Sequence, residues 1–362
     1  MKVLPVLAET LDEIMPPDPR YLDKARGRLD SLTKPLGSLG RLEPLAALIY
    51  AIRSGAIELP LKKAVYVFAA DHGVTCEGVS AYPREVTAQM VQNFLSGGAA
   101  INVLARLHQA ELTVVDVGVD AEFSAVAALH SAKVRYGSRN LLREPAMSPE
   151  ELSSALEVGL HVAHMAQARG QDILAVGEMG IGNTTAASAI TAMLTGQQAA
   201  NVTGRGAGLD AAGRNTKLHI IRKALKRHFP DALSSPKPIP DPINVLRCVG
   251  GLEIAAMTGF ILGAARFRKT ILCDGFISTS AAALAYAIAP QVKGYLIAGH
   301  CSEEPGHRHL LRYIGIPAIL NLGMRLGEGT GAVLAMPIIE SALRLYSEMA
   351  TFASAGVSEA EA

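Results

Sequence analysis

The sequence predicts an α/β fold, in which a doubly wound, mainly parallel sheet is joined by a smaller helical domain built from both chain termini. Between about residue 60 and residue 305, short apolar runs alternate with alanine-rich helical patterns. The runs are almost continuously apolar, as strands are when helices cover both faces of a parallel sheet. At both ends of the chain, apolar residues recur at spacings of three and four, which is the period of a helix.

The elements follow from these patterns in chain order. Two helices are expected first, at 18–34 and 38–55, and two more are expected late in the chain, at 307–315 and 331–355. Pro337 should kink the last helix or remove one of its backbone bonds. The proline-rich composition of 234–244 predicts a loop. The predicted domains are a substrate-binding α/β domain at 58–305 and a helical domain at 1–57 plus 306–362. The predicted strands are 63–73, 111–120, 172–180, 269–276 and 293–302.

Composition excludes several classes of function. The chain has 362 residues with 34 basic and 33 acidic side chains, so its net charge of +1 gives no field for steering onto nucleic acid or an anionic membrane. No apolar stretch approaches the roughly 20 residues that a membrane span needs, and the first residues lack a signal-peptide pattern. We therefore expect a cytoplasmic protein. The four cysteines form no CxxC and the histidines no HExxH, so no metal site is expected.

Polar residues follow the predicted strands at the point where each strand ends. They include Asp71, Asp116, Glu178, Asp274 and His300. Ligands of open α/β sheets bind outside the carboxyl ends of the strands, so this clustering favours a site at that edge. The alternative is that these residues are polar because turns are polar.

Two glycine-rich loops have the composition of a phosphate site. In the first, Gly180 and Gly182 precede Asn183 at the start of a helix, where backbone N–H groups and the helix dipole favour an anion. The loop matches neither GxxxxGK[ST] nor GxGxxG, which disfavours nucleotide hydrolysis and a dinucleotide-dependent dehydrogenase. In the second loop, 203–210, Gly206 is followed by Lys217 in the next helix. The two loops could share one phosphate, or each could be only a tight turn.

A third loop, 325–333, places Glu328 between glycines just before a helix. Met324, Leu326 and Val333 supply apolar surface around it. Burial there would raise the pKa of Glu328 and suit it to act as a base. Alternatively, the carboxylate only stabilises the helix N-terminus, an effect worth about 0.3–1 kcal/mol.

Several long segments resemble one enzyme family. They are AADHGVTCEGVSAYPREVTAQM, GEMGIGNTTAASAI, TGRGAGLD, CDGFISTSAAALA, GHCSEEPGHRHLL and LNLGMRLGEGTGAVLAMPIIESA. From about residue 20 to residue 350 the chain is similar to the nicotinate-nucleotide:dimethylbenzimidazole phosphoribosyltransferases. The resemblance implies transfer of phosphoribose from nicotinate mononucleotide to 5,6-dimethylbenzimidazole, in the assembly of the cobalamin lower loop. It also implies a homodimer that works without a metal or cofactor.

The resemblance also implies roles for individual residues. Glu328 corresponds to the family's catalytic base, and Glu178 to its other active-site carboxylate. The alternatives left open are a non-catalytic nucleotide-binding regulator and a transferase that prefers a different base. The expected phosphate and ribose site comprises Glu178, Gly180, Ile181, Gly182, Asn183, Gly206, Lys217 and Ser302, and the expected base pocket comprises Ser80, Gln89 and Leu326.

Overall fold

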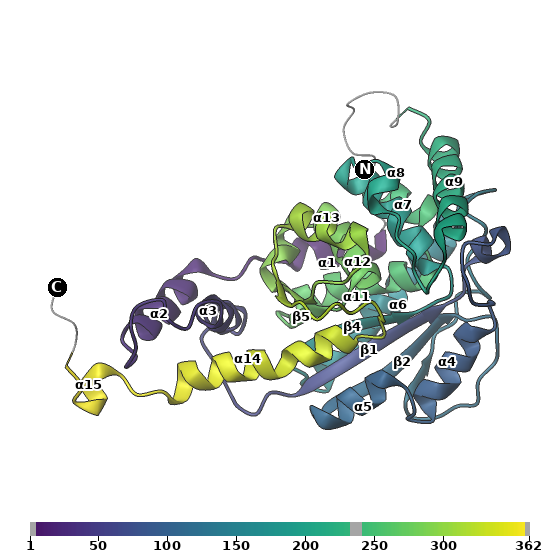
Figure 1. Cartoon of the computed structure of the whole chain (residues 1–362). Coiled ribbons are helices and arrows are strands. Elements are labelled where there is room, and N and C mark those ends of the chain that lie inside the picture. Colours follow the sequence, from purple (N-terminus) through teal and green to yellow (C-terminus); the bar gives the residue numbers. More distant parts are fainter. Residues whose placement is uncertain (1–4, 232–240, 359–362) are drawn as a thin grey trace.

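The chain folds around a seven-stranded parallel sheet that lies between two layers of helices (Figure 1). The computed structural model describes residues 5–231 and 241–358. The predicted α/β class with a parallel sheet is confirmed. In sheet order the strands are β3 (Leu129–Ser131), β2 (Ala110–Gly118), β1 (Lys63–Ala70), β4 (Ile173–Met179), β5 (Thr270–Cys273), β6 (Leu296–His300) and β7 (Ala318–Leu320).

The five predicted strands are present, but the two edge strands β3 and β7 were not predicted. Each edge strand has only three residues, which is too short for an apolar run to be recognised. Neighbouring strands β1 and β4 are separated by about a hundred residues in sequence, and the direction of winding reverses between them. Such a switch point in strand order is where open α/β sheets hold ligands.

Side chains of the central strands alternate between the two helical layers, because successive residues of a strand point to opposite faces. On β1, Tyr66 and Phe68 belong to one buried cluster, whereas Val65 and Val67 belong to the other. Both faces of the strand are therefore buried, which explains why its sequence is continuously apolar.

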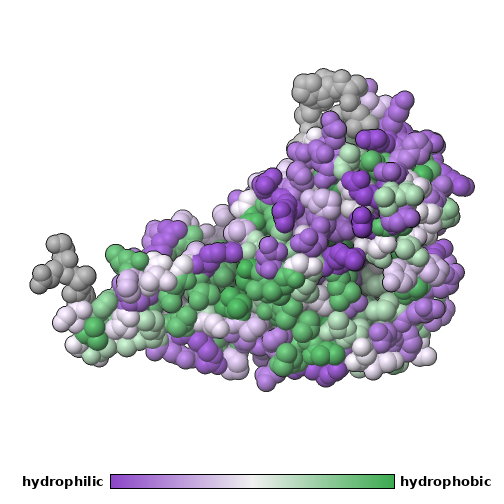
Figure 2. Space-filling model, viewed as in Figure 1, coloured by the Kyte–Doolittle hydropathy of each residue, from purple (hydrophilic) through white to green (hydrophobic). Residues whose placement is uncertain are grey.

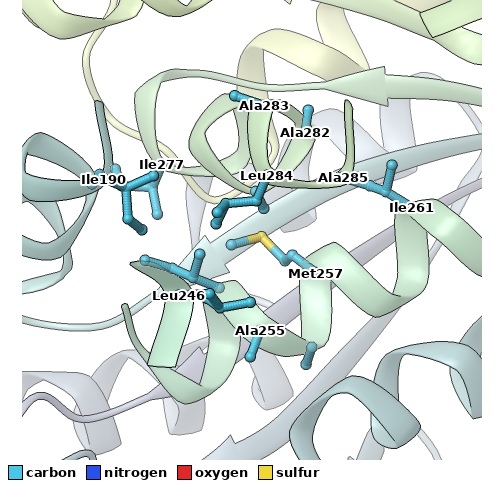
Figure 3. Packing of buried hydrophobic residues seen from close by; sticks show 14 of the residues in the cluster. Ile190, Leu246, Ala255, Met257, Ile261, Ile277, Ala282, Ala283, Leu284 and Ala285 are labelled. Carbon is cyan, nitrogen blue, oxygen red and sulfur yellow. The ribbon is translucent and has the colours of Figure 1, made fainter. Parts of the chain in front are cut away.

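Most of the helices cover the first face of the sheet. Within this layer, Met257 of α11 lies between Leu246 of α10 and Leu284 of α12, and the many alanines around them let the helices approach closely (Figure 3). The elements of this layer are α1 (Pro5–Glu13), α6 (Pro149–Ala168), α7 (Asn183–Thr195), α8 (Ala199–Val202), α9 (Ala211–His228), α10 (Pro242–Val249), α11 (Leu252–Arg266), α12 (Phe276–Ile288), α13 (Pro305–Ile314) and the 3₁₀ turns η1 (Gly73–Glu77) and η2 (Pro290–Tyr295).

The second face is covered by fewer helices, and part of this layer extends beyond the sheet. The helices are α2 (Pro19–Asp30), α3 (Leu42–Ile52), α4 (Val86–Leu95), α5 (Ala100–Leu107), α14 (Thr330–Glu348) and α15 (Phe352–Ala355). We call α2, α3, α15 and the C-terminal half of α14 the arm, because they project from the body of the molecule (Figure 1). Arg28 ties the arm together by donating from Nε to the Tyr346 carbonyl at 2.7 Å.

The two ends of the chain do not lie together throughout. Helix α1 packs on α11 and α6, and α13 and β7 join the sheet layers, while the rest of both ends forms the arm. The domain boundaries at 57/58 and 305/306 stay a prediction. Pro337 lies inside α14, which continues on both sides of it. Most of the predicted loop 234–244 lies outside the described residues.

The contact between α6 and α11 yields a stability prediction. A Cβ on Gly159 would lie 1.9 Å from the Ala256 carbonyl oxygen, so Gly159→Ala must push two helix backbones apart. We expect a loss of unfolding free energy of about 1–3 kcal/mol or more in urea titrations. The control is Gly27→Ala on α2, where nothing lies within 4 Å and the free energy should rise by about 0.5–1 kcal/mol. Similar effects of the two substitutions would contradict this account of the packing.

Candidate active site

A cavity of about 350 Å³ opens at the carboxyl edge of the sheet. The segments after β4, β5 and β6 form its floor, and the loop before α14 forms one wall. The strand-end residues Glu178 and His300 both border it, so the structure brings together side chains that are far apart in sequence. Its lining includes Tyr82, Val86, Met90, Glu178, Met179, Gly180, Ile181, Asn183, Thr184, Gly206, Gly275, His300, Ser302, Glu304, Arg325, Leu326 and Glu328.

Glu178 is the penultimate residue of β4 and is only 6% exposed. Burial, together with the nearby acidic groups Asp274 and Glu253, raises the pKa of this carboxyl to about 8, against a hydrogen bond donated by the Asn183 side-chain amide. At neutral pH and without a bound cation, Glu178 is therefore mostly protonated and can donate a hydrogen bond. A cationic or hydroxyl-bearing ligand would suit this position.

The glycine loop after β4 packs closely against the end of β1 and against α4. A Cβ on Gly180 would lie 2.4 Å from the Ala70 carbonyl oxygen, and Gly182 has a φ of +95°, so both positions need glycine. The Ile181 N–H donates to the Thr87 hydroxyl at 3.1 Å. This N–H is thus occupied within the protein, while the loop and the start of α7 face the cavity.

Glu328 lies across the cavity in an unusual backbone conformation. Its φ is +63°, and the flanking Gly327 and Gly329 both have a φ of +87°. Left-handed backbone is costly for glutamate, so the surroundings must hold it there. Close packing against Gly177 of β4 helps to hold this conformation. A Cβ on Gly177 would lie 2.6 Å from the carbonyl carbon and oxygen of Glu328. The loop therefore rests directly on the strand backbone.

The Glu328 carboxyl is suited to accept a proton. It is 6% exposed, and burial raises its pKa, against a backbone hydrogen bond from Ile101 at the start of α5. Its Oε2 atom has no hydrogen-bond partner within residues 5–231 and 241–358. A buried carboxylate oxygen without a partner is costly unless a ligand supplies one.

Lys217 of α9 reaches the same region from the opposite layer. It is fully buried, and its Nζ donates to the Thr184 hydroxyl at 2.6 Å and lies close to Gly206. Burial lowers the pKa of the amine to about 8, and Glu304 acts in the other direction. The structure thus brings the two glycine loops and the lysine together, as their predicted sharing of one anion requires.

The Gly206 loop is held by charged side chains to which the sequence analysis assigned no role. Glu304 accepts the Gly206 N–H at 2.8 Å, and Arg325 donates to the Gly206 carbonyl at 3.1 Å. A phosphate that takes the Gly206 N–H has to displace the Glu304 carboxylate. Glu304 and Arg325 also line an adjoining cavity of about 620 Å³, which includes Arg205 and Arg214.

Ser302 follows β6 and is fixed by a neutral histidine. Its N–H donates to His307 Nδ1 at 2.8 Å, so this nitrogen carries no proton and Nε2 donates to the Thr279 hydroxyl at 2.9 Å. Burial lowers the pKa of His307 to about 3, which keeps the ring uncharged at neutral pH. The predicted residue Ser302 therefore lies at the cavity with a defined backbone.

The predicted base pocket is only partly brought to the cavity. Leu326 borders the cavity, whereas Ser80 and Gln89 do not. Ser80 accepts the Tyr82 N–H at 3.1 Å, and Gln89 is exposed on α4. The wall near them is instead formed by Tyr82, Val86 and Met90, which the sequence analysis did not single out. Roles for Ser80 and Gln89 stay predictions.

Among the described residues, no group of three His, Cys, Asp or Glu side chains is placed to hold a metal ion. Nor does any helix in these ranges have the length and apolar character to cross a membrane. The sequence analysis noted Asp274 and His300 without assigning them a role, and it did not name Glu304. The signal of all three is their position at or just after the end of a predicted strand.

Nearly the whole chain is similar to known phosphoribosyltransferases. A family model described as phosphoribosyltransferase matches residues 14–357. The chain is 51% identical to the nicotinate-nucleotide–dimethylbenzimidazole phosphoribosyltransferase of Geotalea uraniireducens over 356 residues, which cover 98% of this chain and 99% of that relative. It is 50% identical to the protein of the same name from Desulforudis audaxviator over 357 residues, with 98% and 99% covered.

The fold is also similar to that of a solved relative. The crystal structure of CobT from Thermus thermophilus matches with a TM-score of 0.89 at 46% sequence identity. The match covers 94% of this chain and 100% of that one.

Lys217 gives a prediction on stability. Its pKa lies near 8 when folded and near 10.5 otherwise, so the unfolded chain binds more protons between these values, and the free energy of unfolding should rise with pH over this window. Lys217→Met should lose that rise and be more stable at pH 7, by roughly 2–3 kcal/mol. Urea titrations at several pH values test this, with exposed Lys223→Met on the same helix as control. A pH dependence unchanged by Lys217→Met would contradict the burial of a charged amine.

Proposed function

The chain belongs to the nicotinate-nucleotide:dimethylbenzimidazole phosphoribosyltransferase family, and on that premise we propose that it transfers phosphoribose from nicotinate mononucleotide to 5,6-dimethylbenzimidazole. The products are α-ribazole 5′-phosphate and nicotinate, and the step belongs to assembly of the cobalamin lower loop. We propose Glu328 as the general base. The observation that carries this role is a buried carboxylate with an unpartnered oxygen, at a cavity edge where two other loops can hold a phosphate.

The reaction needs only one proton acceptor. One ring nitrogen of the benzimidazole bonds to the anomeric carbon, and the bond from that carbon to the pyridinium nitrogen breaks. The electron pair of the broken bond stays on that nitrogen, so nicotinate leaves without needing a general acid, unlike the alkoxide of a glycosidase. The other ring nitrogen of the benzimidazole loses its proton to Glu328. Attack opposite the leaving group converts a β bond to an α bond.

Two sides of the cavity suit the two ends of the mononucleotide. Lys217 supplies positive charge between the Gly180–Asn183 loop and Gly206, which supports a phosphate there. Glu178 lies between that loop and Glu328, so it can contact a ribose hydroxyl or the positive charge that develops at the anomeric carbon. Ser302, which also borders the cavity, completes the proposed site for the phosphate and the ribose. A sugar phosphate bearing a cationic ring is a ligand that suits both the loop N–H groups and a carboxylate.

The incoming aromatic base requires an apolar wall. Tyr82, Val86, Met90 and Leu326 supply one beside Glu328 and are partly exposed at the cavity mouth. The choice of 5,6-dimethylbenzimidazole over other bases rests on the family. Ser80 accepts a hydrogen bond from the N–H of Tyr82, which belongs to this wall. Ser80 therefore remains our candidate residue for adjusting the shape of the wall.

We propose that the protein is a homodimer, as the family resemblance implies, and that it is cytoplasmic. Support for the dimer comes from an exposed apolar surface. Hydrophobic side chains gather over α14 and α5 (Figure 2), where Val103 is 53% and Leu107 is 68% exposed. Leu322 and Leu326, in the loop that leads into α14, are also more than half exposed. A second copy that covered this surface would lie beside the loop of Glu328.

Glu328→Gln tests the chemistry. A positioned base contributes about 10²–10⁴-fold, so turnover should fall by a large part of that factor, while the Kd for nicotinate mononucleotide changes little because the amide keeps the size of the side chain. Release of nicotinate and formation of the α-glycoside are followed by chromatography, and binding by calorimetry. Glu348→Gln, exposed at the end of α14, is the matched control. Normal turnover by Glu328→Gln removes Glu328 as the base, and absence of any transfer by the unaltered protein removes the proposed function.

Leu107→Glu tests the dimer. A charge on the exposed end of α5 should convert a dimer to a monomer in light scattering, because a buried unpaired carboxylate is costly. Val126→Glu, at an exposed loop residue outside α5 and α14, should stay dimeric. A monomeric mass for the unaltered protein at micromolar concentration would overturn the proposal.

A further inference from the structure

We propose that Asp274 is a positioning residue, which holds the loop of Glu328 through backbone N–H groups and thereby aims its carboxylate at the reacting base. This inference rests on the proposed function of Glu328 as a base. It concerns a side chain at the end of β5 that has no other role so far. Asp274 does not border the cavity itself, and it acts through the loop that does.

The hydrogen bonds of Asp274 all converge on the loop and the first turn of α14. Its Oδ1 accepts from the Gly331 N–H at 2.7 Å and the Ala332 N–H at 3.1 Å, and its Oδ2 accepts from the Gly329 N–H at 3.2 Å. These donors belong to the start of a helix, where N–H groups have no partner in the helix itself. Asp274, which directly follows strand β5, thus accepts hydrogen bonds from three of these N–H groups and is only 1% exposed.

The loop needs such a clamp because its backbone is held in a rare conformation. Three successive residues, Gly327 to Gly329, have positive φ, and the middle one is Glu328. Gly177 supports the loop from the strand side, but this contact is only a close approach without a hydrogen bond. Thr330 closes the loop locally by donating to the Gly327 carbonyl, and the bond from the Gly329 N–H, directly after Glu328, ties the loop to β5 and orients the peptide that carries the base. Loss of that bond would let the carboxylate turn away from its direction.

The charge of Asp274 acts on the same group. Among the described residues, Asp274 interacts with Glu178 on β4, with the neighbouring Cys273, with His300 on β6 at 3.6 Å, and with Glu328. Burial raises the pKa of Asp274 itself, against His300 and the three N–H donors, which favour its charged form. In its charged form Asp274 raises the pKa of both Glu178 and Glu328. Removing its charge should therefore lower the pKa of Glu328.

Asp274→Asn keeps the shape and the Oδ1 acceptor, but its amide N–H₂ would face the Gly329 N–H. We expect turnover to fall by about 10- to 100-fold, since a shift of about 1 Å in a catalytic group can cost that much. The Kd for nicotinate mononucleotide should stay within about threefold of normal. Because the base must be unprotonated, the acid limb of the turnover–pH profile should move to lower pH. In the Glu328→Gln background, Asp274→Asn should cost little more turnover.

Asp241→Asn is the matched control, because Asp241 caps α10 through the Ile243 N–H at 3.1 Å and lies outside the site. It should leave turnover and its pH profile unchanged. The proposal is overturned if Asp274→Asn has normal turnover or if the acid limb of its turnover–pH profile does not move. It is also overturned if the loss of turnover in Asp274→Asn adds fully to that of Glu328→Gln. A fully additive loss would mark a merely structural role.

A measurement on the unaltered protein covers the case in which Asp274→Asn does not fold. The amides of Gly331 and Ala332 lie in a first helical turn, where exchange with solvent deuterium is ordinarily fast. Their bonds to Asp274 should slow exchange by about 100-fold relative to the same amides in an unstructured chain, and fast exchange would overturn the proposal. This readout does not depend on catalysis, so it separates failure of the clamp from failure of the proposed reaction.

Discussion

The close approach of the Glu328 loop to strand β4 is the constraint on which the candidate site depends. Gly177 has no side chain, so the backbone of Glu328 and Gly329 rests on the strand, and no other residue type leaves room for it. This contact puts the carboxyl of Glu328 beside that of Glu178, although the two are 150 positions apart in sequence. The parallel sheet, covered on both faces, keeps the edge dry enough for both acids to be buried. The fold therefore supplies the low dielectric that makes an ordinary glutamate a useful base at neutral pH.

Burying several acids at one edge creates a repulsion that the rest of the structure moderates. Asp274, Glu178 and Glu328 are each at most 6% exposed. Asp274 raises the pKa of both glutamates, and Glu328 also raises that of Glu178. Part of the compensation comes from uncharged donors, which are the N–H groups at the start of α14, the Asn183 amide and the Ile101 N–H. Lys217 lies on the far side, near Glu304, where we propose that the phosphate of the ligand binds. The site is thus divided into an acidic half and a basic half, which matches a ligand with a cationic ring at one end and a phosphate at the other.

The sequence predicts the parts of this arrangement that local pattern determines. Continuous apolar runs identify the five longer strands, and the glycine loops point to Gly180, Gly182 and Gly206, all of which reach the cavity. Edge strands β3 and β7 are too short to carry a pattern of their own. Asp274 and Glu304 could be noted only as polar residues after a strand, because their roles depend on backbone N–H groups more than 50 residues away for Asp274 and almost 100 for Glu304. Likewise, no local signal distinguishes Tyr82 or Met90, which face the cavity, from Gln89, which faces solvent.

Helix α14 joins the base loop at one end to the arm at the other, so motions of the arm would reach the chemistry if the helix were uniformly stiff. Pro337 interrupts it near the middle. A proline has no N–H to bond with the carbonyl four residues earlier, so the helix is most easily bent there. The half before Pro337 is packed on the sheet, and the half beyond it belongs to the projecting arm. Bending at this joint would let the arm move without shifting the loop that carries Glu328.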